Sequence, residues 1–226
     1  MGKVEIFNFQ VATQDIEGLT DARGDSIKAM LESDYSISVD SVRVILGYQV
    51  KSDISKEEAR RAIYDLFADP IIEFGTLDKS LINNKKLFQK SPEIAITVGF
   101  KPGVTDNAGQ AGLDGLRTIF PQISEESQVA TTMTYLFWGI SNDISPTWLA
   151  SKLHNQMIER ASISDRAECS NSNWPKLDFP ERPVLMEQPS ATVNLEVSDE
   201  ELIEISEKGL LALNLEEMKA IQANYR

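Results

Sequence analysis

The sequence predicts an α+β protein built from two tandem copies of one strand-helix-strand-helix-strand unit. The pattern Gly-apolar-Thr-Asp-x-x-Gly occurs twice, at residues 18–24 and 103–109. A second landmark, Asp-Ile-Ser, also occurs twice and in the same order, at residues 53–55 and 143–145. Self-similarity in a fixed order indicates a duplicated structural unit, and the strand and helix patterns around each landmark agree with it.

The first copy contains all five elements of this unit. Every second residue over 42–50 is large and apolar, which is the period of a strand with one buried face. The Thr-Asp landmark caps the helix before this strand, and Ser55 with Glu58 forms a capping box that predicts a second helix. Pro70 ends the second helix, and residues 71–74 then supply the last strand.

The second copy repeats the same order. Alternating apolar residues over 94–100 predict its first strand. The landmark at residues 103–109 caps the next helix. Ser145 and Pro146 begin the later helix, where the missing N–H of proline leaves no bond unmade. The last strand has only the short run at residues 157–160 to support it.

These elements predict a particular arrangement of the two copies. The helices of each copy must cover one face of a three-stranded sheet, so the other face is apolar and needs a partner. Two such sheets packed on each other form a pseudo-dimer within one chain. We therefore expect unit 1 over residues 1–80, unit 2 over residues 91–166, a linker over residues 79–92, and a monomer with an internal pseudo-twofold axis.

Residues 167–226 form an acidic tail. They hold 5 basic and 12 acidic residues, which is −7 of the net charge of −13. Four prolines without periodicity predict a linker that is mobile from about residue 167 to residue 197. Ser198 and Asn214 then cap two short helices, neither long enough to be stable without packing.

The composition excludes several classes of protein. A net charge of −13 argues against nucleic-acid binding, which depends on basic side chains, and favours a basic or neutral protein partner. No apolar run reaches the ~18 residues that a membrane-spanning helix needs, and the N-terminus lacks the apolar segment of a secretory signal. The single cysteine excludes an internal disulfide. These features predict a cytoplasmic protein.

The reactive side chains predict no catalytic, metal or cofactor site. His154 is the only histidine and lies on a predicted helix, which suits a surface residue better than a triad member. Cys169 lies in the predicted proline-rich linker with no basic neighbour nearer than Arg166, so we expect an inert free thiol. One histidine and one cysteine cannot form a metal cluster. Residues 103–109 match neither the dinucleotide-binding pattern nor the P-loop pattern.

Residues 100–109 read Phe-Lys-Pro-Gly-Val-Thr-Asp-Asn-Ala-Gly. This stretch resembles the PurS subunit of phosphoribosylformylglycinamidine synthase, whose first strand runs into a Lys-x-Gly-Val-x-Asp-x-x-Gly turn. Residues 68–73 are similar to the stretch that leads into the last PurS strand, and residues 42–44 to the middle strand. Two tandem copies also occur in single-chain forms of that enzyme, and residues 213–222 look like the helix that opens the synthetase part.

The resemblance implies two PurS-like units and a tail that leads toward a synthetase domain absent from this chain. In that family the ATP, the magnesium and the catalytic histidine belong to the synthetase, and the reactive cysteine belongs to the glutaminase. It therefore implies a non-catalytic assembly domain whose partners are the synthetase and the glutaminase, and which has no activity alone. The residues it marks as interface or turn positions are Gly18, Asp21 and Gly24 in the first copy, and Lys101, Pro102, Gly103, Asp106 and Gly109 in the second.

An alternative function is also compatible with paired α+β units. Tandem regulatory modules that sense an amino acid or a nucleotide likewise place glycine turns between a strand and a helix. Such modules usually have four strands in each unit, whereas the sequence predicts three. The strand count therefore favours the assembly domain.

Overall fold

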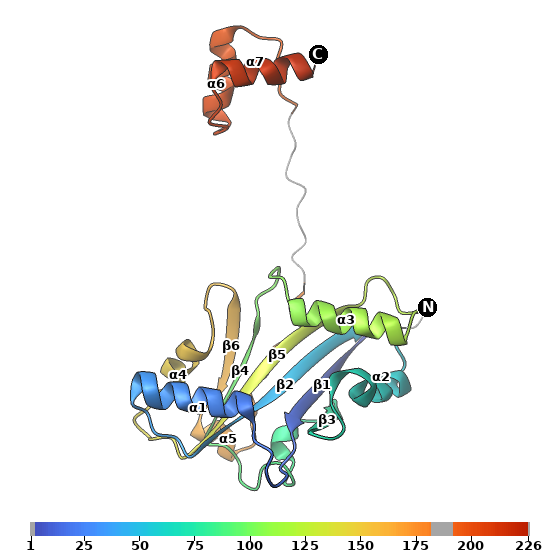
Figure 1. Ribbon diagram of the computed structural model, residues 1–226, viewed down its shortest axis with the longest axis vertical. Coiled ribbons are helices and arrows are strands. Elements are labelled where there is room, and N and C mark those ends of the chain that lie inside the picture. Colours follow the sequence, from blue (N-terminus) through green and yellow to red (C-terminus); the bar gives the residue numbers. More distant parts are fainter. Residues whose placement is uncertain (1–2, 182–191, 226) are drawn as a thin grey trace. The chain divides into compact units, whose positions relative to one another are not determined.

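The computed structural model describes residues 3–181 and 192–225 of the 226-residue chain. It divides into two compact units, residues 1–183 and 184–226, which are described separately below. Figure 1 shows their elements. The elements of the first unit are β1 (Glu5–Thr13), α1 (Ala22–Tyr35), β2 (Ser41–Ser52), α2 (Lys56–Ala62), β3 (Glu73–Leu77), β4 (Ile94–Phe100), α3 (Asn107–Ile119), β5 (Gln128–Trp138), α4 (Pro146–Leu153), β6 (Glu159–Ser164) and α5 (Arg166–Ser170), and those of the second are α6 (Asp199–Lys208) and α7 (Leu215–Asn224).

All six strands form one antiparallel sheet in the order β3-β1-β2-β5-β4-β6. The predicted α+β class is confirmed, and each copy contributes three neighbouring strands. The copies meet edge to edge, where Ser41–Lys51 of β2 pairs with β5. The structure therefore differs from the two packed three-stranded sheets that the sequence predicts. Pairing β2 with β5 satisfies the backbone N–H and C=O groups that two free edges would expose.

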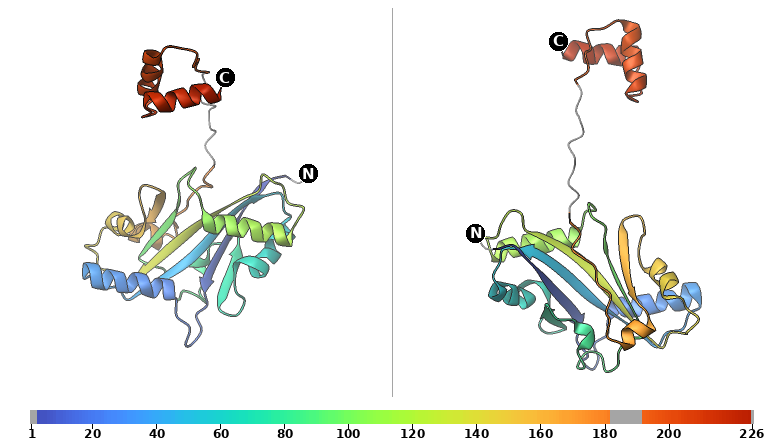
Figure 2. Two further views of the ribbon diagram at one scale, coloured as in Figure 1. Left: turned by 45° about the horizontal axis from the view of Figure 1, so that its top comes forward. Right: turned by 180° about the vertical axis from the view of Figure 1, so that it is seen from behind.

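The helices on one face of the sheet interlock the two copies (Figure 2). Leu31 of α1, from the first copy, is buried in the same cluster as Ile94 of β4, from the second copy. Conversely, Leu116 of α3, from the second copy, is buried with Phe9 of β1. Each copy completes the core of the other, so we expect residues 3–181 to unfold as one cooperative unit.

The opposite face of the sheet is covered by connecting segments. One cluster joins Leu81, Ile82, Leu87 and Phe88 of the linker and Cys169 of α5 to the sheet residues Ala12, Ile45, Ala95 and Leu136. This burial covers the apolar surface for which the sequence predicts a second sheet. A partner sheet is therefore unnecessary at this end of the face.

Residues 173–181 cross the polar part of the same face. The carbonyl oxygen of Leu177 accepts a hydrogen bond from Gln49 Nε2 at 2.9 Å, and Lys51 Nζ forms an ion pair with Glu181 at 2.7 Å. The sequence predicts a mobile linker from about residue 167, but α5 and this segment pack on the sheet instead. Cys169 is buried there among apolar side chains, and carbonyl groups of the segment accept hydrogen bonds from side chains of the sheet. Residues 182–191 of the predicted linker lie outside the described residues.

The second unit contains the two helices predicted for the tail. Ser198 with Glu201 begins α6 and Asn214 with Glu217 begins α7, each through a complete capping box. Leu202 and Met218 are fully buried within this unit. In both units, no helix of the described residues is long and apolar enough to cross a membrane.

Candidate functional site

The duplicated landmark forms the same turn in both copies. Gly18 has a φ of +84° and Gly103 a φ of +85°. A positive φ is favourable for glycine and strained for residues with a Cβ atom. Both glycines therefore lead the chain from the first strand of a copy into its first helix.

Asp21 joins α1 to the central strand of the first copy. One carboxylate oxygen accepts a hydrogen bond from Gly24 N at 3.1 Å and caps the helix. The other oxygen accepts from Val44 N at 2.7 Å. The pairing of β1 with β2 ends at Ile45, one residue away, so Asp21 bonds the first N–H beyond that pairing. The side chain is buried, and Arg43 Nε lies 3.5 Å from its carboxylate.

Asp106 does the same in the second copy. It caps α3 by accepting a hydrogen bond from Gly109 N at 2.7 Å. Its other oxygen accepts from Thr131 N at 2.6 Å, and the hydroxyl of Thr131 also donates to the carboxylate. The pairing of β4 with β5 ends at Thr132, again one residue away. The two aspartates are therefore equivalent structural links between a helix start and a strand.

The last glycine of each landmark allows the helix to lie directly on the strand. A Cβ atom at Gly24 would lie 2.1 Å from the carbonyl oxygen of Val42, and one at Gly109 would lie 2.4 Å from that of Val129. Both separations are far below van der Waals contact. Glycine is thus required at both positions for close packing of α1 and α3.

The remaining residues marked by the resemblance lie at the exposed start of the second landmark. Lys101, Pro102 and Gly103 are exposed. Lys101 Nζ donates a hydrogen bond to the carbonyl oxygen of Gln156 at 2.6 Å, and its backbone N–H donates to Ile158. The marked residues therefore lie in two separate turns, one in each copy. Their hydrogen bonds cap a helix, join that helix to a strand or hold the turn in place.

Replacing Asp21 or Asp106 with alanine tests the role of these links. We expect each change to lower the free energy of unfolding by about 2–4 kcal/mol, because a helix cap is lost and a strand N–H is left without its acceptor. Denaturant unfolding followed by circular dichroism measures the loss. Asp114→Ala, at an exposed position of α3, is the control and should change stability by less than about 0.5 kcal/mol. Equal effects at Asp106 and Asp114 would contradict this role.

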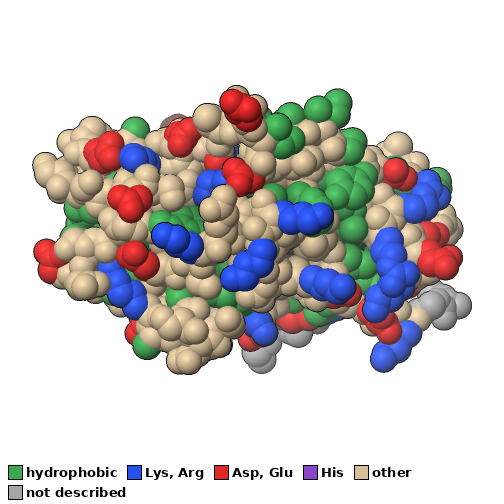
Figure 3. Space-filling model, turned by 90° about the horizontal axis from the view of Figure 1, so that it is seen from below, with side chains coloured by type: hydrophobic (Ala, Val, Ile, Leu, Met, Phe, Trp, Pro, Cys, Tyr) green, Lys and Arg blue, Asp and Glu red, His purple; other side chains and the backbone are tan. Residues whose placement is uncertain are grey.

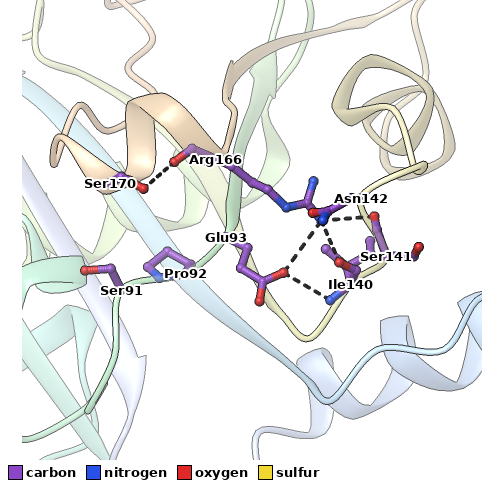
Figure 4. Close-up of a pocket in the computed structure, with 8 residues that line it drawn as sticks. All are labelled: Ser91, Pro92, Glu93, Ile140, Ser141, Asn142, Arg166 and Ser170. Carbon is purple, nitrogen blue, oxygen red and sulfur yellow. Dashed lines mark hydrogen bonds and ion pairs between the residues drawn. The ribbon is translucent and has the colours of Figure 1, made fainter.

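A cleft of about 620 Å³ lies between the start of β4, the loop after β5 and α5 (Figure 4). The carboxylate of Glu93 accepts hydrogen bonds from Gly139 N and Ile140 N, both at 3.2 Å. Arg166 donates to the carbonyl oxygens of Ile140 at 2.5 Å and Ser141 at 2.9 Å, and lies 3.6 Å from Glu93.

The charged groups of this cleft are used to hold the loop after β5. Glu93 binds its N–H groups and Arg166 binds its carbonyl groups, and the two charges compensate each other. Ser91, Asn142 and Ser170 also line the cleft, and neither histidine nor cysteine does. The cleft can admit a small polar molecule, but its side chains form no nucleophile and base pair.

Glu93 and Arg166 were not predicted as site residues from the sequence. The two residues are far apart in the chain and belong to no motif, so the sequence contains no signal that joins them. Their proximity depends on the pairing of β4 with β6, which places the start of α5 beside the start of β4.

His154 and Cys169 also occupy structural positions. His154 Nδ1 lies 2.6 Å from the carbonyl oxygen of Ala150, at the end of α4. Cys169 is buried, and desolvation raises the pKa of its thiol to about 11. The thiol donates a hydrogen bond to the carbonyl oxygen of Ser164 at 3.4 Å. Among the residues that the structure describes, no group of three or more metal-ligating side chains comes together.

The raised pKa of Cys169 predicts slow reaction with thiol reagents. The thiolate is the reactive form, and a pKa near 11 instead of 9 leaves about a hundredfold less of it at pH 8. We expect the native protein to react with a disulfide reagent at least about a hundredfold more slowly than the denatured chain. Stopped-flow absorbance measures both rates, and similar rates would show that α5 does not protect the thiol.

Comparisons with known proteins identify no family for this chain. No protein-family model matches it, and no curated protein matches it.

Proposed function

We propose that this chain is a non-catalytic assembly domain of phosphoribosylformylglycinamidine synthase, the purine-biosynthetic glutamine amidotransferase, formed by two PurS-like units. The observation that carries the proposal is the duplicated landmark within two strand-helix-strand-helix-strand copies. Its second occurrence also has the lysine and proline that resemble the PurS turn. In the structure the landmark residues form turns and helix caps, a role that an assembly domain can use.

The proposed role has a clear physical purpose. Ammonia released from glutamine by a glutaminase must reach the substrate that the synthetase activates with ATP. A small neutral nucleophile that escapes into water returns only by diffusion, whereas a docked complex keeps it at a high effective concentration. An assembly domain supplies this docking and needs no reactive group of its own.

The second unit supports the same proposal. Its helix α7 begins at Leu215 within residues 213–222, the stretch that resembles the opening helix of the synthetase part. Leu210 is 90% exposed and Leu211 is 48% exposed on this small unit. In the proposed enzyme, the synthetase covers these two side chains.

Reconstitution with the synthetase and glutaminase components of the enzyme tests the proposal. The chain alone should have no ATPase, glutaminase or ligase turnover. Added to the two components, it should raise glutamine-dependent ligase activity by about tenfold or more, through docking alone. Activity with free ammonia should stay the same, because the synthetase does not need docking to use it.

Two results would contradict the proposal. The first is glutamine-dependent activity that does not change when the chain is added. The second is turnover by the isolated chain that disappears when one of its own residues is replaced. Isothermal titration provides a separate test, since tight binding of an amino acid or a purine nucleotide to the chain alone would favour the sensing module.

A further inference from the structure

The linker between the two copies forms a basic surface on an acidic protein. Residues 79–92 contain four lysines and no acidic residue, although the whole chain has a net charge of −13. Lys79, Lys85, Lys86 and Lys90 are all exposed. None of the four forms an ion pair within residues 3–181 and 192–225. We call these four lysines the basic face.

The segment that carries the basic face is fixed to the sheet by buried side chains and hydrogen bonds. The linker side chains Leu81, Leu87 and Phe88 are no more than 6% exposed. The N–H of Leu81 donates a hydrogen bond to Gln10 Oε1 at 2.7 Å, and Trp138 Nε1 donates to the carbonyl oxygen of Lys90 at 3.2 Å. The backbone that carries the lysines is therefore held in place before any partner binds, which lowers the entropy lost on docking.

Exposed apolar residues lie on the loops near the same end of the sheet. Ile16 is 48% exposed, Ile71 is 76% exposed and Ile72 is 43% exposed. Gln14 joins their two loops, since its backbone N–H donates to Ile72 and its Nε2 lies 3.3 Å from the carbonyl oxygen of Ile71. Phe74, which follows these loops in β3, packs in the same cluster as the linker.

Figure 3 shows the face of the molecule on which these segments lie. Lys and Arg side chains lie across it with Asp and Glu side chains among them, and exposed hydrophobic side chains lie beside the Lys and Arg side chains. A mixture of apolar contacts with surrounding charges is typical of protein-protein interfaces.

We infer that the basic face and the neighbouring isoleucines dock an acidic surface of a protein partner. The four lysines attract an acidic surface within the ~8 Å Debye length of physiological salt. Pairing of opposite charges across an interface favours one orientation of the partner. The inference rests on the proposed function, because it takes the partner to be the synthetase or glutaminase component. The net charge alone would instead favour a basic or neutral partner.

Charge reversal in the reconstituted system tests this surface. We would measure binding of the full chain to each component by biolayer interferometry, at low and at physiological salt. Lys85→Glu with Lys86→Glu should lower the association rate of one component by about tenfold or more at low salt. Ile71→Ser should raise the dissociation rate. Lys3→Glu with Lys56→Glu, at two exposed positions outside the linker, is the matched control and should leave binding unchanged.

The outcomes separate this inference from the proposed function. Binding that weakens only with the linker and Ile71 changes supports both. Binding that is equal for the wild type and the linker variant overturns the docking surface and leaves the assembly role intact. Absence of binding by the wild type overturns the assembly role and the inference with it. Tighter binding of a duplex oligonucleotide than of either component, lost in the linker variant, would replace the protein partner with nucleic acid.

Discussion

Replacing Gly109 with alanine should lower the stability of the protein by about 2 kcal/mol. The added Cβ atom would lie 2.4 Å from the carbonyl oxygen of Val129 and 2.8 Å from Asp106 Oδ2. The carbonyl oxygen of Val129 is backbone, and Asp106 Oδ2 is held by its hydrogen bond from Thr131 N. We therefore expect α3 to move away from β5, and overpacking of this kind costs roughly 1–3 kcal/mol or more. The better helix propensity of alanine offsets only part of this loss. Thermal unfolding should show a melting temperature lower by about 4–8 °C.

Gly112 in the same helix provides the matched control. A Cβ atom there would lie 3.4 Å from Phe67 and 3.5 Å from Val129, which is ordinary van der Waals contact. Gly112→Ala should therefore raise stability by about 0.5–1 kcal/mol, through helix propensity and a less flexible unfolded chain. Changes of the same sign at Gly109 and Gly112 would show that close packing on β5 is not the reason for the landmark glycine.

Replacing Val44 with aspartate should unfold the protein or destabilise it by about 5 kcal/mol or more. Val44 is buried in the cluster that α1, α4 and the central strands share. A carboxylate there loses its hydration without gaining a partner, and the burial of the valine is lost as well. Because each copy completes the core of the other, the loss should affect both copies together. Circular dichroism and fluorescence should report one unfolding transition, shifted far below that of the wild type.

Ser41→Asp places the same carboxylate at an exposed position of the same strand. It should change stability by less than about 0.5 kcal/mol. If Val44→Asp unfolded only the first copy and left β4 and β6 protected from hydrogen exchange, the copies would be independent. That result would contradict the interlocked core.

Local chemistry explains which elements were predictable from the sequence. The Asp21, Ser55, Asp106 and Ser145 caps are short-range signals, because the capping side chain and the N–H it bonds lie within three residues. The alternation over β2 and β4 follows from one buried face, which each strand shows by itself. Strand β6 was harder to predict, because its residues are only half-buried at the edge of the sheet and its pattern is correspondingly weak.

The sequence by itself determined the duplicated unit, its order of strands and helices, the residues that cap the helices of the two copies, and the two tail helices. Only the tertiary structure decided how the copies combine. Two three-stranded units can pack face to face or pair edge to edge, and both choices bury the same alternating residues. The difference lies in backbone hydrogen bonds between β2 and β5 and in the segments that cover the opposite face. Backbone groups are the same for every residue type except proline, so no pattern of side chains along the chain records that pairing.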